Sequence, residues 1–319
     1  MLVTGDRVGD ALLKWPVISG LKHAFPNLDI TWVAGRRASV FCGPLRELAK
    51  NTINTAIENA NIGNSWLEML REPPSLNADV VISTEPKMRN AFLAKRIPHR
   101  RFVSPALNFR FSDVKPQQDQ DPKRSVQDRL QQLFELAFEA NIEPLHVVPV
   151  TQTLTSLAAE LLPTDQVYIG FSPGAGGARK RWPLARFIDT AKAQSNRGRC
   201  PVFFLGPDEQ RLLTEIKAAV PTAKFPEYDE SHQRRGGVML SIALAARMAC
   251  SVANDSGGGH ILAAGGRPLV SLYGHTSAMK FQPKYGPHIA INASQFSSQS
   301  IDAIPVHAVL ESIEQGLGS

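Results

Sequence analysis

The sequence predicts an α/β protein made of two doubly wound domains. Short apolar strands alternate with helical patterns along the chain, which is typical of parallel sheets covered by helices. Between residues 144 and 163, three prolines and a threonine-rich piece interrupt this alternation and indicate a linker. We therefore expect an N-terminal domain over residues 1–150 and a C-terminal domain over residues 151–319, both of ordinary domain size.

Composition bounds the class of protein. The 319 residues are 43% hydrophobic and 20% charged, which is typical of a globular chain. The three cysteines lie far apart and form no Cys-x-x-Cys, so neither a disulfide framework nor a zinc ribbon is indicated, and a reducing cytoplasm fits. Charged residues break the apolar stretches of the first thirty positions, and no run approaches the roughly 18 apolar residues of a membrane span. The net charge of +6 permits an acidic partner.

The first domain opens with a β-α-β unit. A short strand at 1–4 precedes a helix over 11–24 and a second strand over 28–34. The connecting loop carries Gly5-x-x-x-Gly9 and lacks Gly-x-Gly-x-x-Gly, which disfavours a dehydrogenase. Because this loop belongs to the carboxyl edge of the sheet, Asp10 is a candidate general base that takes a proton from an attacking hydroxyl. Helix N-capping is an equally good use of Asp10 from the residue alone.

A basic segment follows the strand expected at 80–83. Residues 87–129 contain eleven Lys or Arg and four Asp, which gives a net charge of +7. The end of this segment overlaps a helix expected over 127–140. Such a segment is either a solvated face or a positive surface toward an anionic acceptor. We select Arg96, Arg100 and Arg101 as candidate acceptor-binding residues. The pair Asp119 and Asp121 lies in a polar stretch typical of an exposed loop, so no metal site is predicted.

The second domain repeats the alternation. Strands are expected at 167–171, 202–205, 250–254, 269–273 and 289–291. Helices are expected after Trp182-Pro183, after residues 206–209 to about 219, at 238–248 and at 306–317. Three loops follow strands, at 172–181, 206–209 and 254–260. They should meet on one carboxyl edge, where α/β sheets bind ligands.

The first two loops carry groups suited to a nucleotide. Backbone amides at Gly174, Ala175 and Gly176 could approach a phosphate, followed by three cations in sequence, Arg179, Lys180 and Arg181. Any of these cations could bind phosphate, and the sequence alone does not choose among them. Glu209 or Asp208 could accept hydrogen bonds from ribose hydroxyls, or be an ordinary first-turn residue of the next helix.

The third loop is the most informative. Gly257, Gly258 and Gly259 leave bare backbone at the first turn of a helix, where unpaired amides favour an anion, and His260 belongs to the same turn. Either Asp255 or Ser256 could cap this helix. A carboxylate beside an anion site must face hydroxyls, a cation or the helix amides. A nucleotide-sugar offers both a diphosphate and hydroxyls, so these residues predict a nucleotide-sugar site.

Together these residues resemble the heptosyltransferase family, glycosyltransferase family 9, which builds the inner core of bacterial lipopolysaccharide. The segments that resemble its motifs, in order, are Gly9-Asp10-Ala11-Leu12-Leu13 with Pro16, Pro173-Gly174-Ala175 with Lys180-Arg181-Trp182-Pro183, and Asn254-Asp255-Ser256-Gly257 with His260 and Gly274-His275-Thr276. The resemblance implies a GT-B fold with two Rossmann-like domains facing across a cleft. It also implies an ADP-linked heptose donor, inversion at the anomeric carbon and no metal.

The resemblance further assigns roles. It implies that Asp10 is the base, that Lys180 holds the diphosphate, and that Asp255, Ser256, Gly257 and His260 hold the sugar and phosphates of the donor. The expected protein is thus a cytoplasmic inverting glycosyltransferase without a cofactor, using ADP-sugar as co-substrate and contacting the anionic inner-membrane surface peripherally. Its partners would be the donor and a lipopolysaccharide core or other glycolipid, and not nucleic acid. A nucleotide-sugar epimerase of the same fold and a non-catalytic assembly protein are the alternatives.

Overall fold

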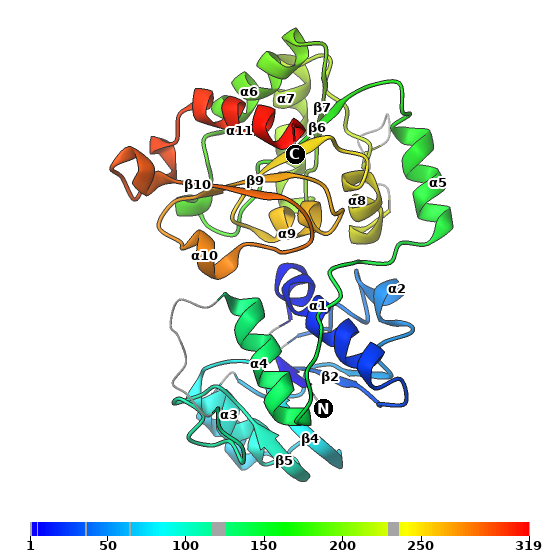
Figure 1. Ribbon diagram of the computed structural model, residues 1–319, viewed down its shortest axis with the longest axis vertical. Coiled ribbons are helices and arrows are strands. Elements are labelled where there is room, and N and C mark those ends of the chain that lie inside the picture. The colour runs from blue at the N-terminus through cyan, green and yellow to red at the C-terminus, as the bar shows by residue number, and fades with distance from the viewer. Residues whose placement is uncertain are drawn as a thin grey trace. The chain divides into compact units, whose positions relative to one another are not determined.

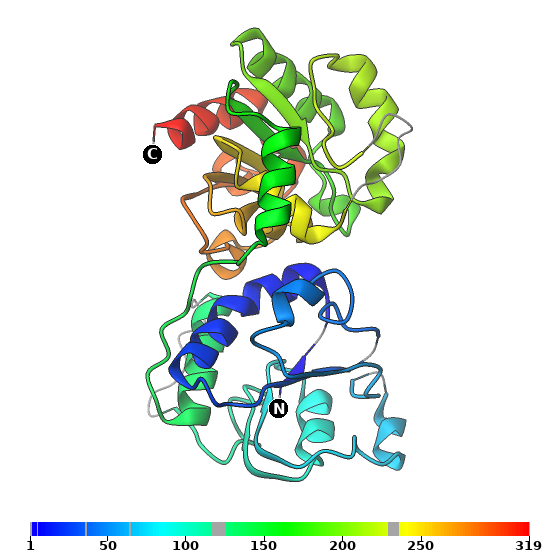
Figure 2. The ribbon, with the colours of Figure 1, turned by 90° about the vertical axis from the view of Figure 1, so that its right-hand side faces the viewer.

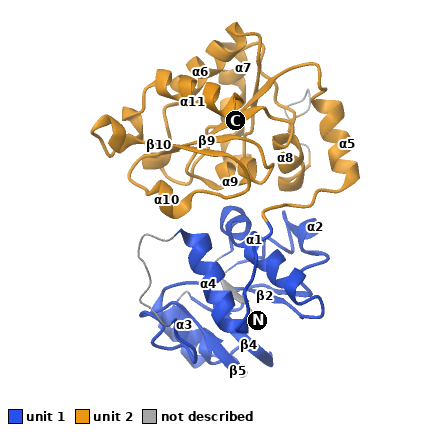
Figure 3. Ribbon diagram, viewed as in Figure 1, with its two compact units in different colours: residues 1–145 blue, residues 146–319 orange. Residues whose placement is uncertain are grey.

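The chain folds into two compact units that divide between Leu145 and His146, as Figure 3 shows. This computed structural model describes residues 2–4, 6–35, 37–63, 65–116, 125–228 and 236–318, with the backbone alone at 2–4. Within that part of the chain, each unit contains one five-stranded parallel sheet with helices around it (Figure 1). The two sheets confirm the predicted α/β class.

The sheet of the first unit has the strand order β3-β2-β1-β4-β5. Its strands are β1 (Leu2–Thr4), β2 (Thr31–Ala34), β3 (Thr55–Ile57), β4 (Ala78–Ser83) and β5 (His99–Val103). Strand β2 is shorter than the predicted 28–34 because Leu28 belongs to a turn, its amide donating to the carbonyl of Phe25 at 3.0 Å. The strand order reverses between β1 and β4, and this switch point is where doubly wound sheets bind ligands.

Helices cover this first sheet. They are α1 (Val8–Ala24), α2 (Arg46–Ala49), the 3₁₀ helix η1 (Trp66–Leu70), α3 (Met88–Lys95) and α4 (Val126–Phe138). Ser125 caps α4, since its hydroxyl accepts from the amide of Asp128 at 3.1 Å, and Asp128 completes a capping box. Helix α4 packs against α1, where buried Gln127 donates to the carbonyl of Leu13 at 3.3 Å.

The second unit has the strand order β10-β9-β8-β6-β7. Its strands are β6 (Tyr168–Ser172), β7 (Cys200–Phe203), β8 (Cys250–Asn254), β9 (Leu269–Tyr273) and β10 (His288–Asn292). Strands β6, β8 and β9 are buried along their whole length, as expected for a parallel sheet with both faces covered. The order reverses between β6 and β8, which places a second switch point between the loops that follow these two strands.

The helices of the second unit are α5 (Gln152–Leu161), η2 (Ala178–Lys180), α6 (Leu184–Asn196), η3 (Pro207–Leu212), α7 (Leu213–Ala219), α8 (Val238–Ala245), α9 (Gly257–Ala263), α10 (Ala278–Phe281), η4 (Ala293–Phe296), η5 (Ile301–Ala303) and α11 (Val306–Leu317). Helix α5 corrects the expectation of an irregular linker over 144–163. It is capped by Thr151 and packs on α8. Figures 1 and 2 show α5 lying beside α8. The threonines that suggested a linker supply the cap and the first turn of this helix.

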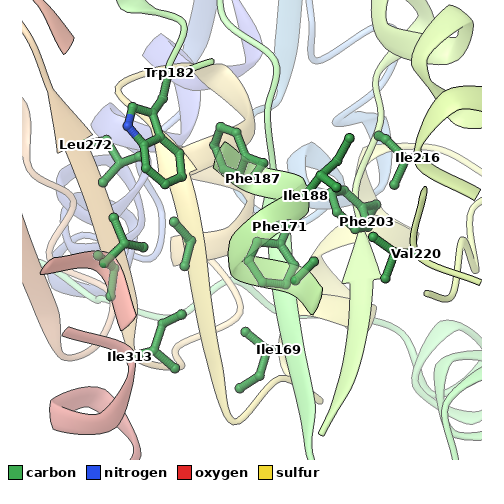
Figure 4. Packing of buried hydrophobic residues seen from close by; sticks show 14 of the residues in the cluster. Ile169, Phe171, Trp182, Phe187, Ile188, Phe203, Ile216, Val220, Leu272 and Ile313 are labelled. Carbon is green, nitrogen blue, oxygen red and sulfur yellow. The ribbon is translucent and has the colours of Figure 1, made fainter. Parts of the chain in front are cut away.

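Aromatic side chains fill the core of the second unit (Figure 4). Phe171 and Phe203 stack with their ring centroids 5.2 Å apart, and Trp182 meets Phe187 edge to face at 5.0 Å. The indole of Trp182 also donates to the carbonyl of Ile304 at 2.9 Å, so its polar atom is satisfied inside the core. Trp182 directly follows the glycine-rich loop, and the core therefore anchors the end of that loop.

No helix among the described residues could span a membrane. None of them combines the required number of residues with sufficient apolar character to cross a bilayer.

Candidate active site

The glycine-rich loop after β6 is held by one buried side chain from β8. The amide oxygen of Asn254 accepts from the backbone amide of Trp182 at 3.1 Å, and its amide nitrogen donates to the carbonyl of Pro173 at 2.8 Å. Asn254 is fully buried, so these hydrogen bonds are shielded from water. Both ends of the loop are thereby fixed to the strand on the other side of the switch point.

The three consecutive glycines of α9 have different local surroundings. A Cβ on Gly258 would lie 2.2 Å from the hydroxyl of Ser172, and one on Gly259 would lie 2.8 Å from the carbonyl oxygen of Asn254. A Cβ on Gly257 would meet no atom within 4 Å. Gly258 and Gly259 therefore permit the close approach of α9 to the strand ends, whereas Gly257 leaves space at the first turn.

A pocket of about 300 Å³ opens at this edge of the second sheet. Its walls combine segments from five parts of the unit: Ser172, Gly174, Ala175, Gly176, Arg181, Phe204, Gly206, Asp208, Glu209, Glu227, Ser241, Ser256, Gly257, Gly258 and Ile261. Six predicted donor-binding positions therefore meet at one pocket: Gly174, Ala175, Gly176, Glu209, Ser256 and Gly257. Lys180, Asp255 and His260 are not among the lining residues.

Glu209 is the better placed of the two candidate ribose carboxylates. Its carboxyl carbon lies 2.6 Å from where a Cβ of Gly174 would stand, and one carboxyl oxygen lies 2.7 Å from the corresponding point at Gly206. The carboxylate thus folds back over the backbone of both glycine positions. Asp208, one residue earlier in the first turn of η3, is exposed.

Lys180 and Asp255 form an ion pair with 2.7 Å between Nζ and Oδ2. The Asp255 side chain is 7% exposed and that of Lys180 is 35% exposed, so the pair is partly shielded from solvent. Asp255 therefore faces a cation, and Ser256 caps α9 by accepting from the amide of Gly259 at 3.4 Å. The pair neutralises the carboxylate that would otherwise repel an anion at this edge.

The neighbouring cations differ in placement. Arg181 lines the pocket, and its Nε donates to the carbonyl of Ala175 at 2.9 Å. Arg179 is exposed in η2. His260 lies partly buried in α9. Burial of His288 is the main cause that lowers the pKa of His288 to about 4, and the charge of His260 is the second cause. His288 therefore remains neutral at physiological pH while its Nε2 lies 2.9 Å from the hydroxyl of Ser271.

Asp10 lies in the first turn of α1, at the switch point of the first sheet. The helix begins at Val8 and its N-cap is Arg7, so the alternative use of Asp10 as the cap is wrong. The side chain is exposed, and a carboxylate in the first turn is stabilised by the positive end of the helix dipole. Asp10 is thus a solvent-accessible anion on an ordered element.

Asp10 is not isolated, because a buried lysine lies one helical turn away. Lys14 is 8% exposed, and its ammonium lies 5.8 Å from the ring centroid of Trp32. Burial lowers the pKa of Lys14, while the carboxylates of Asp10, Glu85 and Asp6 act in the opposite direction. The indole of Trp32 donates to Asp6 at 3.2 Å, and Asn90 donates to Glu85. One buried cation therefore compensates a group of carboxylates around the switch point.

The predicted acceptor-binding arginines do not lie at this edge. Arg100 and Arg101 stand at the start of β5, at the amino edge of the sheet, and Arg96 follows the end of α3. Arg96 donates to the carbonyls of Glu68 and Arg71, and Arg101 donates to that of Ala137 and pairs with Glu139. Arg100 pairs with Asp79 at 3.3 Å, with both side chains at least 80% exposed.

The metal prediction cannot be followed at its two aspartates, since Asp119 and Asp121 lie outside the described residues. Within the described part of the chain, no group of three or more His, Cys, Asp or Glu side chains is arranged to hold a metal ion.

A family model described as glycosyltransferase family 9 (heptosyltransferase) matches residues 74–303. The chain belongs to this family. The family 9 enzyme is 28% identical over 318 residues to lipooligosaccharide heptosyltransferase 2 of Haemophilus influenzae, with 92% of this chain and 87% of that protein covered. The resemblance inferred from the motifs is thereby confirmed.

Two solved structures share the fold of this family 9 enzyme. A family 9 glycosyl transferase from Veillonella parvula matches with a TM-score of 0.72 at 21% identity, covering 99% of this chain and 96% of that one. The Escherichia coli heptosyltransferase WaaC with ADP-2-deoxy-2-fluoro heptose matches with a TM-score of 0.67 at 18% identity, covering 98% of each chain. These matches confirm the GT-B fold.

Sequence reasoning missed several residues that shape the two sites of the family 9 enzyme. Asn254 was noted only as part of a motif, and nothing in the sequence indicated that its amide fixes both ends of a loop some 75 residues earlier. Lys14 is one of the charged residues that break the apolar stretches of the first thirty positions. Its position four residues after Asp10, on the buried side of an apolar helix, was the available signal. Glu227 and Ser241 carried no sequence signal.

Proposed function

We propose that this chain transfers a heptose from an ADP-activated donor to a lipopolysaccharide core acceptor with inversion, and that Asp10 is the general base. The observation that carries the proposal is the pocket of the second unit. Loops that follow three different strands meet there beside bare glycine backbone, with a carboxylate against the loop and a cation in the wall. The ADP-sugar analogue held by the Escherichia coli enzyme of the same fold supports the choice of donor.

The pocket offers distinct partners for each part of the donor. The amides of residues 174–176 and 257–258 would donate hydrogen bonds to the diphosphate oxygens, because first-turn and loop amides have no helical partner of their own. Arg181 is the cation in the pocket wall, and Lys180 would reach a phosphate only by exchanging or sharing its contact with Asp255. Glu209, folded over Gly174, is placed to accept from the ribose hydroxyls.

The proposed reaction is a single displacement. The carboxylate of Asp10 takes the proton of an acceptor hydroxyl, whose oxygen attacks the anomeric carbon from the face opposite the diphosphate. The bond between that carbon and the diphosphate oxygen breaks, and ADP leaves with the electron pair. Its developing charge is met by the pocket amides and by Arg181 and Lys180. Lys14 would keep the carboxylate group around Asp10 from accumulating uncompensated charge.

The proposal is tested by mixing the purified chain with ADP-heptose and a heptose-deficient lipopolysaccharide core. Mass spectrometry should find acceptor heavier by one heptose and an equal amount of released ADP. The same reaction in EDTA tests the prediction that no metal is needed, and loss of turnover restored by Mg²⁺ or Mn²⁺ would refute it. Release of ADP without a heavier acceptor would show hydrolysis of the donor. If neither released ADP nor a heavier acceptor is found, the proposed reaction is contradicted.

Peripheral contact with an anionic membrane surface is a further part of the proposal. Arg100 is the best test residue, because its guanidinium is 87% exposed while those of Arg96 and Arg101 donate to backbone carbonyls. One surface cation contributes roughly 1 kcal/mol to such binding at low salt. Arg100→Glu should therefore sediment less with anionic vesicles than Lys217→Glu, the same charge reversal at an exposed position of α7 in the second unit. Equal sedimentation of the two variants would reject this contact.

A further inference from the structure

The first unit carries a group of exposed apolar side chains to which the proposed function gives no role. Among the described residues, eleven large apolar side chains are exposed, and seven of them lie between Trp66 and Leu107. Leu67 and Leu70 of η1 are 71% and 85% exposed. Single exposed apolar residues are common on protein surfaces, whereas a cluster of them marks a surface that binds a partner.

Helix geometry gathers these side chains on neighbouring faces. Residues three apart eclipse one another in a 3₁₀ helix, so Leu67 and Leu70 form one row along η1. Met88 and Phe92 lie four residues apart on α3 and share a face of that helix. The rings of Trp66 and Phe92 meet with their centroids 6.4 Å apart, and this contact joins η1 to α3. These five side chains make up the apolar patch.

Two arginines of α3 and its C-cap hold η1 in place. Arg89 donates to the carbonyl of Gly63, before η1, at 2.6 Å. Arg96 donates to the carbonyls of Glu68 and Arg71, within and just after η1, at 3.2 and 2.8 Å. The leucines of η1 are therefore exposed on a segment whose backbone is fixed at both ends, and they are not part of a loosely held loop.

The apolar patch extends from the carboxyl edge of the first sheet along α3. This helix starts after the carboxyl end of β4 and leads to the start of β5 at the amino edge. The segment before η1 is tied to the end of β2, because the amide of Ile62 donates to the carbonyl of Gly35 at 3.0 Å. The patch therefore begins at the edge of the first unit that carries Asp10.

Basic residues surround the apolar patch. The segments 65–72 and 87–96, which contain η1 and α3, together have five Lys or Arg and two Glu, which gives a net charge of +3. Arg71, Lys87 and Lys95 are exposed. Positive charge beside apolar surface favours a partner that is both apolar and anionic.

The surface of an anionic bilayer has this combination of properties. Trp, Leu and Phe flanked by Lys and Arg are typical of segments that lie in the lipid interface, with the apolar side chains at the acyl boundary and the cations at the headgroups. A second copy of this chain would match the leucines, but a symmetric contact would bring the same positive charges together. The charge therefore favours the bilayer over a dimer.

We infer that the apolar patch of η1 and α3 inserts into the interface of an anionic bilayer and is the surface through which this chain contacts the membrane. The inference deepens the proposed peripheral contact by naming its surface, and it rests on the proposed function for the glycolipid acceptor. The comparison of Arg100→Glu with Lys217→Glu tests charge at the amino edge, so the two tests can fail separately.

Trp66 is a reporter within the patch. The chain contains four tryptophans, and Trp66 is 47% exposed while Trp15, Trp32 and Trp182 are at most 1% exposed. Vesicles of phosphatidylglycerol and phosphatidylethanolamine should shift the tryptophan emission to shorter wavelength, and brominated acyl chains should quench it. Trp66→Phe keeps an aromatic ring at this position and should lose both signals while still sedimenting with the vesicles.

Sedimentation with the same vesicles measures the contribution of the leucines. The double variant Leu67→Gln with Leu70→Gln should partition into vesicles at least about tenfold more weakly than the wild type. Val167→Gln with Met279→Gln replaces two exposed apolar residues of the second unit and should bind as the wild type does. The difference should persist at about 1 M NaCl, where charges are screened within roughly 3 Å, because burial of apolar surface is not screened.

Several results would overturn the inference. Wild-type protein that does not bind the vesicles, or that sediments with them while brominated lipids leave its emission unquenched, would do so without any variant. A leucine double variant that binds vesicles as well as the wild type would also reject the patch. A wild-type dimer in light scattering that the double variant lacks, with equal vesicle binding by both, would assign the patch to a second copy of the chain.

Transfer assays separate this inference from the proposed function. With a deacylated, water-soluble acceptor the leucine double variant should turn over as the wild type does, and with the acceptor in vesicles it should be slower. Quenching and sedimentation as expected from a wild type that transfers no heptose to either acceptor would support the membrane contact and contradict the proposed reaction.

Discussion

The switch points of the two units are built by different means. In the second unit, bare backbone shapes the site. Gly258 and Gly259 admit close packing, Gly257 leaves space, and Asn254 ties a loop across the sheet. In the first unit, a buried charge shapes the site, because Lys14 compensates the carboxylates of Asp10, Asp6 and Glu85. The second arrangement suits a ligand that brings its own negative charge, and the first suits a group that must take up a proton.

Under the proposed function, the edge of the second unit binds the donor and the edge of the first unit supplies the general base. A site of amides and paired charges binds an anion without changing protonation. In the proposal, the exposed carboxylate of Asp10, one helical turn from the buried Lys14, is the group that takes the proton of the acceptor. We therefore expect substitutions in the first unit to affect turnover and substitutions in the second to affect nucleotide affinity.

The largest expected effect is at Asp10. Asp10→Asn keeps the size of the side chain and removes its ability to take a proton, so transfer should fall by about 10²–10⁴-fold, the usual contribution of a general base. The ADP affinity measured by calorimetry should not change. Asp29→Asn, an exposed aspartate before β2 at the amino edge, is the matched control. Turnover at the wild-type rate in Asp10→Asn would end the assignment.

Lys14→Met sharpens the same comparison. It removes the buried ammonium while keeping an unbranched side chain, so transfer should fall by less than in Asp10→Asn and ADP affinity should stay the same. A loss of ADP affinity in this variant would show that the two edges do not divide their tasks.

The next effect concerns the cation that holds the diphosphate. Each charge-assisted hydrogen bond contributes about 1.5–3 kcal/mol, so removing its donor should lower the affinity for ADP by roughly tenfold to hundredfold. Lys180→Ala should reach this range because it also leaves Asp255 unpaired beside the phosphates. Arg181→Ala tests the cation of the pocket wall. If Arg181→Ala lowers the affinity for ADP and Lys180→Ala does not, the role predicted for Lys180 belongs to Arg181.

The glycines of α9 give a matched pair of smaller effects. In Gly259→Ala the new Cβ would lie 2.8 Å from the carbonyl oxygen of Asn254, so the backbone must move, and overpacking of this kind costs about 1–3 kcal/mol of stability. Gly257→Ala should unfold at the wild-type temperature but bind ADP more weakly, because its methyl group enters the pocket. Thermal unfolding and calorimetry on both variants check the pair, and a destabilised Gly257→Ala would contradict it.

The smallest effect distinguishes the units by pH. Burial and the charge of His260 lower the pKa of folded His288 to about 4, below the ordinary value of 6.5, so the unfolded state takes up its proton first. The second unit should therefore lose stability as pH falls from about 6.5 to 4, by roughly 1–2 kcal/mol at pH 5. Burial raises the pKa of Asp6, so the folded first unit takes up this proton before the unfolded state does. Protonation of Asp6 therefore adds to the stability of the first unit as pH falls, which is the opposite of the effect of His288.

Calorimetry of thermal unfolding at pH 7 and pH 5 checks this prediction. His288→Gln should flatten the pH dependence of the stability of the second unit. His307→Gln, at an exposed position of α11, should leave this pH dependence unchanged. A second-unit transition that is equally stable at both pH values would be inconsistent with a buried neutral His288.

The second unit was the more predictable from sequence. Its strands are continuous apolar runs that end at glycine or at polar residues, and β9 and α11 have the predicted bounds. The joint carboxyl edge also follows from parallel topology, and six predicted positions meet in the pocket, although their roles stay predictions. What sequence could not supply was the choice among Arg179, Lys180 and Arg181, because three adjacent residues in a loop have no periodicity to orient them.

The first unit was less predictable for physical reasons. Strand β3 is three residues long, and β5 begins with His99, Arg100 and Arg101, so neither has the apolar pattern of a buried strand. Of the three arginines selected for the acceptor, Arg100 and Arg101 lie at the amino edge because they start β5, and no spacing rule could show that without locating this strand. The charge group around Lys14 depends on contacts between α1, β2 and the loop after β4, which are distant in sequence.

Amide hydrogen exchange of the whole chain with and without ADP tests the division of tasks most directly. We expect ADP to slow exchange in the segments 172–181, 204–209 and 256–261 of the second unit and to leave exchange in the segment 6–14 around Asp10 unchanged. Slowing concentrated in 6–14, with the three segments of the second unit unaffected, would contradict it.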